Sequence, residues 1–174
     1  MKTLLSHGLV SLLMLLSSVT SFAEPSQIRI STFSADITPP LGHPLLAGLR
    51  PAAKSIKTQL FAKGVVIHGN QKPIVIAALD WCELRNDAYD YWRSAIAKAV
   101  GTTRERVVLS CVHQHDTPYA DLTAQDLLDK NGLKDAMFNR DFFHTAAANV
   151  ARAARDSLEK QTTASHVSSV QTKV

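Results

Sequence analysis

The stretch Arg106–Pro118, RVVLSCVHQHDTP, decides the fold of this chain. A short β-branched and apolar run ends abruptly in two histidines, a carboxylate, a hydroxyl and a proline. This pattern predicts a buried strand whose last residues leave the sheet carrying metal-binding or acid–base groups. His113 and His115 are two positions apart, so on an extended backbone both imidazoles would lie on the same side. They could hold zinc together, or one could bind metal while the other contacts a substrate.

The residues before this strand predict a parallel β-α-β unit. Residues 72–80 form an apolar strand that ends at Asp80, and residues 83–100 have apolar residues at helical spacing. A strand, a helix and a strand in this order imply two parallel strands that release the chain at the same edge of the sheet. Asp80 and His113 are therefore expected at one edge. Because the first strand is apolar on both faces, we expect it to be a central strand covered by helices.

The rest of the chain predicts a mixed sheet with helices packed on it, an α/β fold. The further elements that we expect are strands over 27–37 and 59–68, a helix over 124–130, a helix over 141–160 and a strand over 164–174. Gly69-Asn70-Gln71 indicates a hairpin turn between 59–68 and 72–80. The helix over 83–100 has Asn86 or Asp87 available as its cap, and Gly101 ends it. Residues 41–56 form a long irregular segment, which is either a surface loop or the wall of a binding site.

The first 23 residues have the pattern of a cleaved secretory signal. Lys2 supplies a positive charge, Leu4–Val19 is mostly apolar, and Ser21-Phe22-Ala23 offers small residues before a cut at Glu24. Residues 24–174 are then expected to form one domain of an exported protein, secreted or periplasmic. Removing Lys2 lowers the formal net charge from +4 to +3.

The composition argues against a nucleic-acid partner, and it does not decide whether the two cysteines form a disulfide. The basic residues are scattered and no stripe interleaves them with aromatic residues, so nucleic-acid binding is not expected. Cys82 and Cys111 are the only cysteines. In an exported chain they could form a disulfide or remain as buried free thiols.

Two histidines are only part of a catalytic zinc site, which takes about three protein ligands and an open position for water. Asp80 or Asp116 could add an oxygen ligand, or could orient a histidine ring from outside the coordination shell.

Three stretches resemble the N-terminal region of the neutral/alkaline (non-lysosomal) ceramidases. They are Ser34–Gly42 (SADITPPLG), Ala77–Cys82 (AALDWC) and Val108–Pro118 (VLSCVHQHDTP). That family opens with an Ala-Asp-Ile-Thr-Pro-Pro-type segment, continues with a strand ending in Asp, and then carries a His-Thr-His-Ser-Gly-Pro motif. The order and spacing match over nearly all of the chain after residue 23.

The resemblance implies a zinc-dependent hydrolase of sphingolipid metabolism that cleaves the N-acyl bond of ceramide or of a related lipid amide. His113 would be the first zinc ligand, and His115 would be catalytic, contacting substrate or the developing oxyanion. Gly48 would belong to a loop that lines the substrate pocket. Contact with a membrane surface would come through the lipid substrate.

The chain also departs from the family pattern. Gln114, Asp116 and Thr117 replace the family's Thr, Ser and Gly, which adds a negative charge after the histidines and puts the exact substrate in question. The family's remaining zinc ligands lie further along than Val174. We therefore expect an N-terminal portion of a longer enzyme, not active by itself. The alternative is a non-catalytic or truncated ceramidase-like domain that binds a lipid or another small ligand; the sequence does not set the oligomeric state.

Overall fold

The computed structural model describes residues 27–173 of the chain. The predicted signal peptide, residues 1–23, lies outside the described residues. No helix in the described part is long and apolar enough to cross a membrane.

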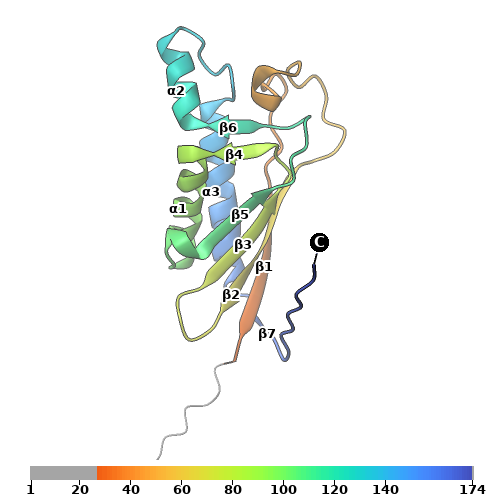
Figure 1. Cartoon of the computed structure of the whole chain (residues 1–174), viewed down its shortest axis with the longest axis vertical. Coiled ribbons are helices and arrows are strands. Elements are labelled where there is room, and N and C mark those ends of the chain that lie inside the picture. The colour runs from red at the N-terminus through yellow and green to blue at the C-terminus, as the bar shows by residue number, and fades with distance from the viewer. Residues whose placement is uncertain (1–26, 174) are drawn as a thin grey trace, which may run out of the picture.

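A five-stranded mixed sheet forms the centre of the molecule (Figure 1), in the order β5-β3-β2-β1-β7. The strands are β1 (Arg29–Asp36), β2 (Phe61–His68), β3 (Ile74–Leu79), β5 (Val107–Cys111) and β7 (Thr162–Thr163). The predicted hairpin is confirmed, since β2 and β3 pair antiparallel. The predicted parallel pair is also confirmed, because β3 and β5 are parallel neighbours with Leu79 opposite Cys111.

Two long helices cover one face of this sheet. They are α1 (Asn86–Val100), which connects β3 to β5, and α3 (Arg140–Ser157), which packs against α1 and β1. A shorter helix, α2 (Leu122–Lys130), contacts α1 beyond the end of the sheet. Figure 1 shows α1 and α3 behind the strands and α2 above them. The predicted helices over 124–130 and 141–160 are thus confirmed.

The core lies between the sheet and these helices. Three aromatic rings, each at most 1% exposed, pack in a row: Trp81, Trp92 and Phe143. The ring centroids of Trp81 and Trp92 are 5.0 Å apart, and those of Trp92 and Phe143 are 6.0 Å apart. The indole Nε1 of Trp81 donates a hydrogen bond of 2.9 Å to the carbonyl oxygen of Ile37. The chain that leaves β3 towards the candidate site is therefore fixed by a buried aromatic anchor.

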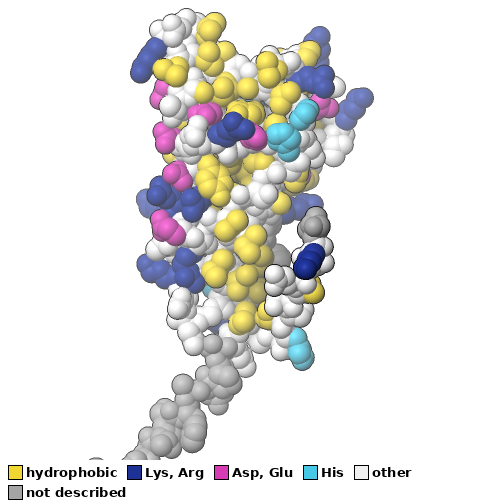
Figure 2. Space-filling view, in the orientation of Figure 1, with side chains coloured by type: hydrophobic (Ala, Val, Ile, Leu, Met, Phe, Trp, Pro, Cys, Tyr) yellow, Lys and Arg dark blue, Asp and Glu magenta, His cyan; other side chains and the backbone are white. Residues whose placement is uncertain are grey.

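No helix or strand within residues 27–173 covers the second face of the sheet, which corrects the expectation that β3 would be a strand covered by helices. Ile74, Ile76 and Val108 are 36%, 47% and 49% exposed. Ile76 and Val108 are directly opposite each other on β3 and β5. Figure 2 shows hydrophobic side chains gathered over this part of the sheet. An apolar run in the sequence indicates that both faces of a strand are apolar. It does not indicate that other elements cover both faces.

Two short strands continue the parallel pair beyond the edge of the main sheet. β4 (Glu83–Arg85) follows β3, and β6 (Tyr119–Asp121) follows β5; they pair parallel to each other. The prediction that the helix begins at Glu83 was therefore wrong by three residues. Its predicted side-chain cap was also wrong, because the capping position is Arg85 without a side-chain hydrogen bond, while Asn86 has a φ of +47°.

The predicted strand over 164–174 is absent from the described residues 164–173. In this last part of the chain, only the two residues of β7 pair with β1, and residues 164–173 after β7 have no regular structure. Val167 and Val170 are 75% and 94% exposed. The alternation of apolar and polar residues there has no partner strand to satisfy its backbone groups, so it does not produce a strand.

Candidate functional site

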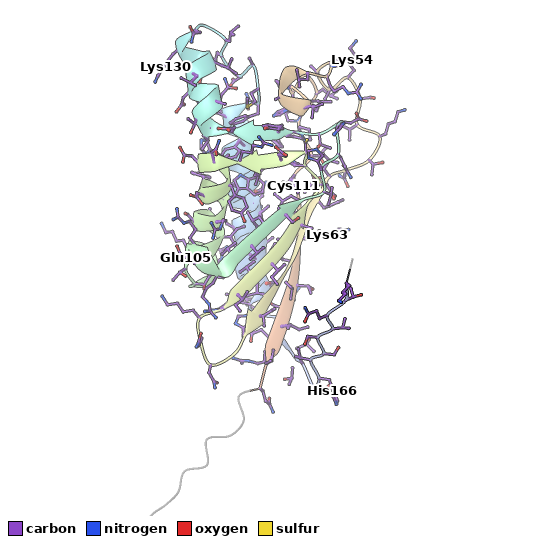
Figure 3. All side chains as sticks on the ribbon, viewed as in Figure 1. Lys54, Lys63, Glu105, Cys111, Lys130 and His166 are labelled. Atoms are coloured by element: carbon purple, nitrogen blue, oxygen red, sulfur yellow. The ribbon has the colours of Figure 1, made fainter. Side chains whose placement is uncertain are left out.

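The two histidines lie at the edge of the sheet where β3 and β5 end. The backbone N–H of Val112 donates to the carbonyl oxygen of Leu79 at 3.0 Å, and that of His113 donates to the carbonyl oxygen of Trp81 at 3.2 Å. Cys111 in Figure 3 marks the end of β5 at this edge. The shared edge predicted from the strand–helix–strand order is confirmed.

The two imidazoles are close together, but not for the predicted reason. Their ring centroids are 5.2 Å apart with an interplanar angle of 78°, an edge-to-face pair. However, β5 ends at Cys111, and His113 has a φ of +65°, a left-handed conformation that residues other than glycine rarely adopt. A turn, not an extended strand with side chains alternating between its two sides, brings the rings together.

Backbone and side-chain groups from the end of β3 surround one nitrogen of His113. Nδ1 is 3.2 Å from the carbonyl oxygen of Cys82, 3.6 Å from Oε1 of Glu83 and 3.7 Å from Sγ of Cys82. The side chain is 58% exposed. With the carbonyl and the carboxylate at Nδ1, the proton belongs on that nitrogen. Nε2 is then the nitrogen with a lone pair for a metal or a substrate proton.

Glu83 is held in turn by its neighbours on β4 and β6. Arg85 forms an ion pair with its carboxylate and donates a hydrogen bond of 3.2 Å to Oε1, and Tyr119 is the register partner of Glu83 on β6. The hydrogen bond from Arg85 is the main cause of a lowered pKa for Glu83, and it outweighs the effect of burial. The carboxylate is therefore ionised at neutral pH. Sequence reasoning missed Glu83 because it assigned this residue to the following helix.

The two cysteines are free thiols. They line a cavity of about 360 Å³ together with Glu83 and His113. Burial raises the pKa of Cys111 to about 11 and also raises that of Cys82. Both are therefore protonated at neutral pH and are poor thiolate ligands in this state.

The two carboxylates that were predicted to support the histidines have other contacts. Oδ2 of Asp80 accepts a hydrogen bond of 2.9 Å from the backbone N–H of Phe61, at the start of β2. Asp116 lines a groove on the outer side of the histidine turn. Their proposed roles around a metal stay predictions.

This groove of about 480 Å³ lies at the histidine turn, but neither His113 nor His115 is among the residues that line it. One part of its lining is Gln114, Asp116 and Thr117, which flank His115 in the chain; the rest comes from residues 38–60. Between the alternatives for the irregular segment 41–56, the structure therefore favours the wall of a groove.

Gly48 has a structural reason for being glycine. It ends the short 3₁₀ turn η1 (Leu46–Gly48) with a φ of +81°, and a Cβ there would lie 2.9 Å from the carbonyl oxygen of Ala136. Gly48 does not line the 480 Å³ groove. Its predicted contact with substrate stays a prediction.

His43 anchors the loop that forms the groove wall. It is 3% exposed, its Nδ1 lies 2.6 Å from the carbonyl oxygen of Pro44, and its Nε2 accepts a hydrogen bond of 3.2 Å from the backbone N–H of Asn139. Its ring packs edge-on against Phe142 at 5.2 Å. Burial lowers the pKa of His43, against the opposing effects of the Pro44 carbonyl and of Asp135. It is therefore a neutral structural histidine.

These residues fit part of a zinc site. His113 has the features of a zinc ligand: its imidazole is exposed, and the Glu83 carboxylate near Nδ1 leaves Nε2 to bind a metal. His115 is beside it. Among residues 27–173, however, no group of three or more His, Cys, Asp or Glu side chains is placed to hold a metal ion. The described chain therefore supplies fewer ligands than the three or so of a catalytic zinc.

The fold is found in known ceramidases. The neutral ceramidase of Pseudomonas aeruginosa superposes with a TM-score of 0.60 and 18% identity over 80% of this chain. A ceramidase in complex with C2 superposes with a TM-score of 0.59 and 16% identity over 79% of this chain. This chain spans 23% and 22% of the length of those two proteins. No protein-family model matches the sequence, and no curated protein matches it. At these identities the likeness establishes the fold.

Proposed function

We propose that this chain is the histidine-bearing N-terminal part of a zinc-dependent amide hydrolase of the ceramidase type. The observation that carries the proposal is the position of His113 and His115. They lie after the end of a parallel strand in a ceramidase-like fold, and their chain neighbours Gln114, Asp116 and Thr117 line a groove of about 480 Å³. Ligand sites in α/β sheets commonly lie at this edge.

The substrate in this proposal is ceramide or a related lipid amide. His113 would be a zinc ligand through Nε2, with Nδ1 held by the carbonyl oxygen of Cys82 and the Glu83 carboxylate. When bound, zinc would polarise the amide carbonyl and lower the pKa of an attacking water. His115, edge-on to His113, would contact the substrate or the oxygen on which charge develops. Export to the periplasm or the medium belongs to the same proposal and is supported by the predicted signal.

A hydrolysis assay tests the function. The chain in its full-length natural form would be incubated with a ceramide bearing a fluorescent acyl group, with and without a chelator, and then with zinc restored. We expect release of the fluorescent fatty acid that the chelator abolishes and zinc restores. His113→Ala should abolish release, whereas His166→Ala, which changes an exposed histidine after β7, should leave it unchanged.

Two results would contradict the proposal. Hydrolysis that is insensitive to the chelator would exclude the metal chemistry. Binding of ceramide without cleavage in the presence of zinc, equal in the parent and in the His113→Ala form, would favour the non-catalytic lipid-binding domain instead.

A further inference from the structure

The loop of residues 41–57 carries an unusual combination of exposed side chains, and we call it the basic–apolar loop. Leu41, Leu49 and Ile56 are 60%, 80% and 50% exposed. Arg50, Lys54 and Lys57 are exposed beside them, and the loop contains no Asp or Glu. Figure 3 shows Lys54 on the outer side of this loop, at the same end of the molecule as the site.

Backbone hydrogen bonds hold the loop in a defined shape. The N–H of Gly42 donates to the carbonyl oxygen of Ala53 at 2.7 Å, and the N–H of Ala53 donates to that of His43 at 3.0 Å. Closer to the tip, Leu45 and Arg50 form a β-bridge. The exposed apolar side chains are therefore presented by an ordered loop, so a partner would not have to bear the entropy cost of ordering it.

The base of the loop connects it to the candidate site. The N–H of Leu46 donates to the carbonyl oxygen of Thr117 at 3.0 Å. Lys54, Ile56 and Lys57 line the 480 Å³ groove, whose only acidic lining residue is Asp116. A partner that covers the loop would therefore lie at the mouth of the groove.

A lipid bilayer surface fits this chemistry. Apolar side chains enter the boundary between headgroups and acyl chains, while Lys and Arg keep their charged ends among the headgroups. Each Lys or Arg near an anionic surface strengthens binding by about fivefold. Three cations with no acid in the loop therefore favour anionic lipids.

Leu127, an exposed leucine at another place in the molecule, lacks this setting. Leu127 on α2 is 59% exposed, as much as Leu41, but its neighbour Asp126 and the nearby Asp129 are acidic. These two carboxylates form ion pairs with Arg140, whereas the basic–apolar loop contains no acid, so exposure of a leucine alone does not create such a site.

We infer that the basic–apolar loop docks this protein on anionic membranes, with Leu41, Leu49 and Ile56 entering the interface and Arg50, Lys54 and Lys57 contacting the headgroups. Docking would bring the groove mouth to the lipid surface. The inference stands on the loop and is independent of zinc and of hydrolysis.

Vesicle binding tests the inference. The protein would be mixed with vesicles of phosphatidylcholine alone or of phosphatidylcholine and phosphatidylglycerol in equal amounts, and the pelleted fraction would be measured with chelator present. We expect binding to the mixed vesicles only, with affinity falling as salt is raised because salt screens the charges.

Matched variants locate the surface. Lys54→Gln with Lys57→Gln should weaken binding by about 25-fold, at about fivefold for each cation. Leu49→Ser should weaken it by roughly tenfold or more, because a buried leucine side chain is worth about 1.5–3 kcal/mol of transfer free energy. Leu127→Ser and Lys98→Gln should bind like the parent. Circular dichroism would establish that each variant is folded.

The inference would be overturned by failure of the folded parent to bind mixed vesicles, by equal binding to both kinds of vesicle, or by equal losses in the control variants. None of these results would affect the hydrolysis proposal, which the fluorescent ceramide assay tests in detergent without vesicles.

Discussion

Replacing His43 with alanine should detach the groove wall from α3. The change removes the acceptor for the backbone N–H of Asn139 and the edge-on contact with Phe142, both in a buried setting. An unsatisfied buried N–H costs about 1–3 kcal/mol. Lost packing of the ring adds about 1 kcal/mol by area. We therefore expect the free energy of unfolding to fall by about 3 kcal/mol.

Denaturation in urea and in a thermal scan would measure this loss. For a chain of this size, about 3 kcal/mol corresponds to a decrease of roughly 6–12 °C in the melting temperature. His43→Gln keeps an acceptor near the position of Nε2 and should recover about half of the loss. His166→Ala serves as the control, because His166 is exposed. A His43→Ala variant within about 0.5 kcal/mol of the parent would refute the assignment of His43 as an anchor.

The same residue predicts a dependence of stability on pH. The pKa of His43 is lowered in the folded state, so the folded chain binds its proton less readily than the unfolded chain does. Its contribution to stability is complete above the unfolded pKa of about 6.5 and is lost as pH falls from there towards the folded value. The parent should lose stability over this window more steeply than His43→Gln. Identical pH profiles for the two proteins would contradict the assignment.

Two further substitutions test the site and the loop. Glu83→Gln should weaken zinc binding by about 10–100-fold in competition with a chromophoric chelator, because it removes the charge behind Nδ1 of the proposed ligand; unchanged affinity, or an equal loss in the exposed Glu105→Gln, would remove Glu83 from that role. Gly48→Ala should destabilise the chain by more than Gly132→Ala. Both glycines have positive φ, but only at Gly48 would the new Cβ meet a backbone oxygen, at 2.9 Å. Equal melting temperatures for these two variants would show that the close contact has no cost.

The parallel strand pair could be predicted because it depends on local patterns in the sequence. Short stretches of sequence predict each element: apolar runs predict the strands, and a helical repeat that ends at Gly101 predicts the helix. The rules for strand–helix–strand connections then predict that the two strands are parallel, as β3 and β5 are. The hairpin before β3 follows from the turn residues Gly69-Asn70-Gln71 in the same way.

The immediate surroundings of the histidines could not be predicted, because they depend on pairing between segments far apart in the chain. β4 and β6 are three residues each, too short to show a period, and they exist because they pair with each other. That pairing places Glu83 near the imidazole of His113. Asp80 instead accepts a hydrogen bond from the backbone N–H of Phe61. The positive φ of His113 likewise comes from hydrogen bonds to the chain after β3, which no local signal reports.

The central claim is that His113 is a zinc ligand, and metal content measures this most directly. The full-length natural protein, its His113→Ala variant and the His166→Ala control would be loaded with zinc, dialysed and analysed by atomic emission. The account predicts stoichiometric zinc in the parent and in the control, and a loss of nearly all zinc in His113→Ala. Equal zinc content in all three proteins would contradict it.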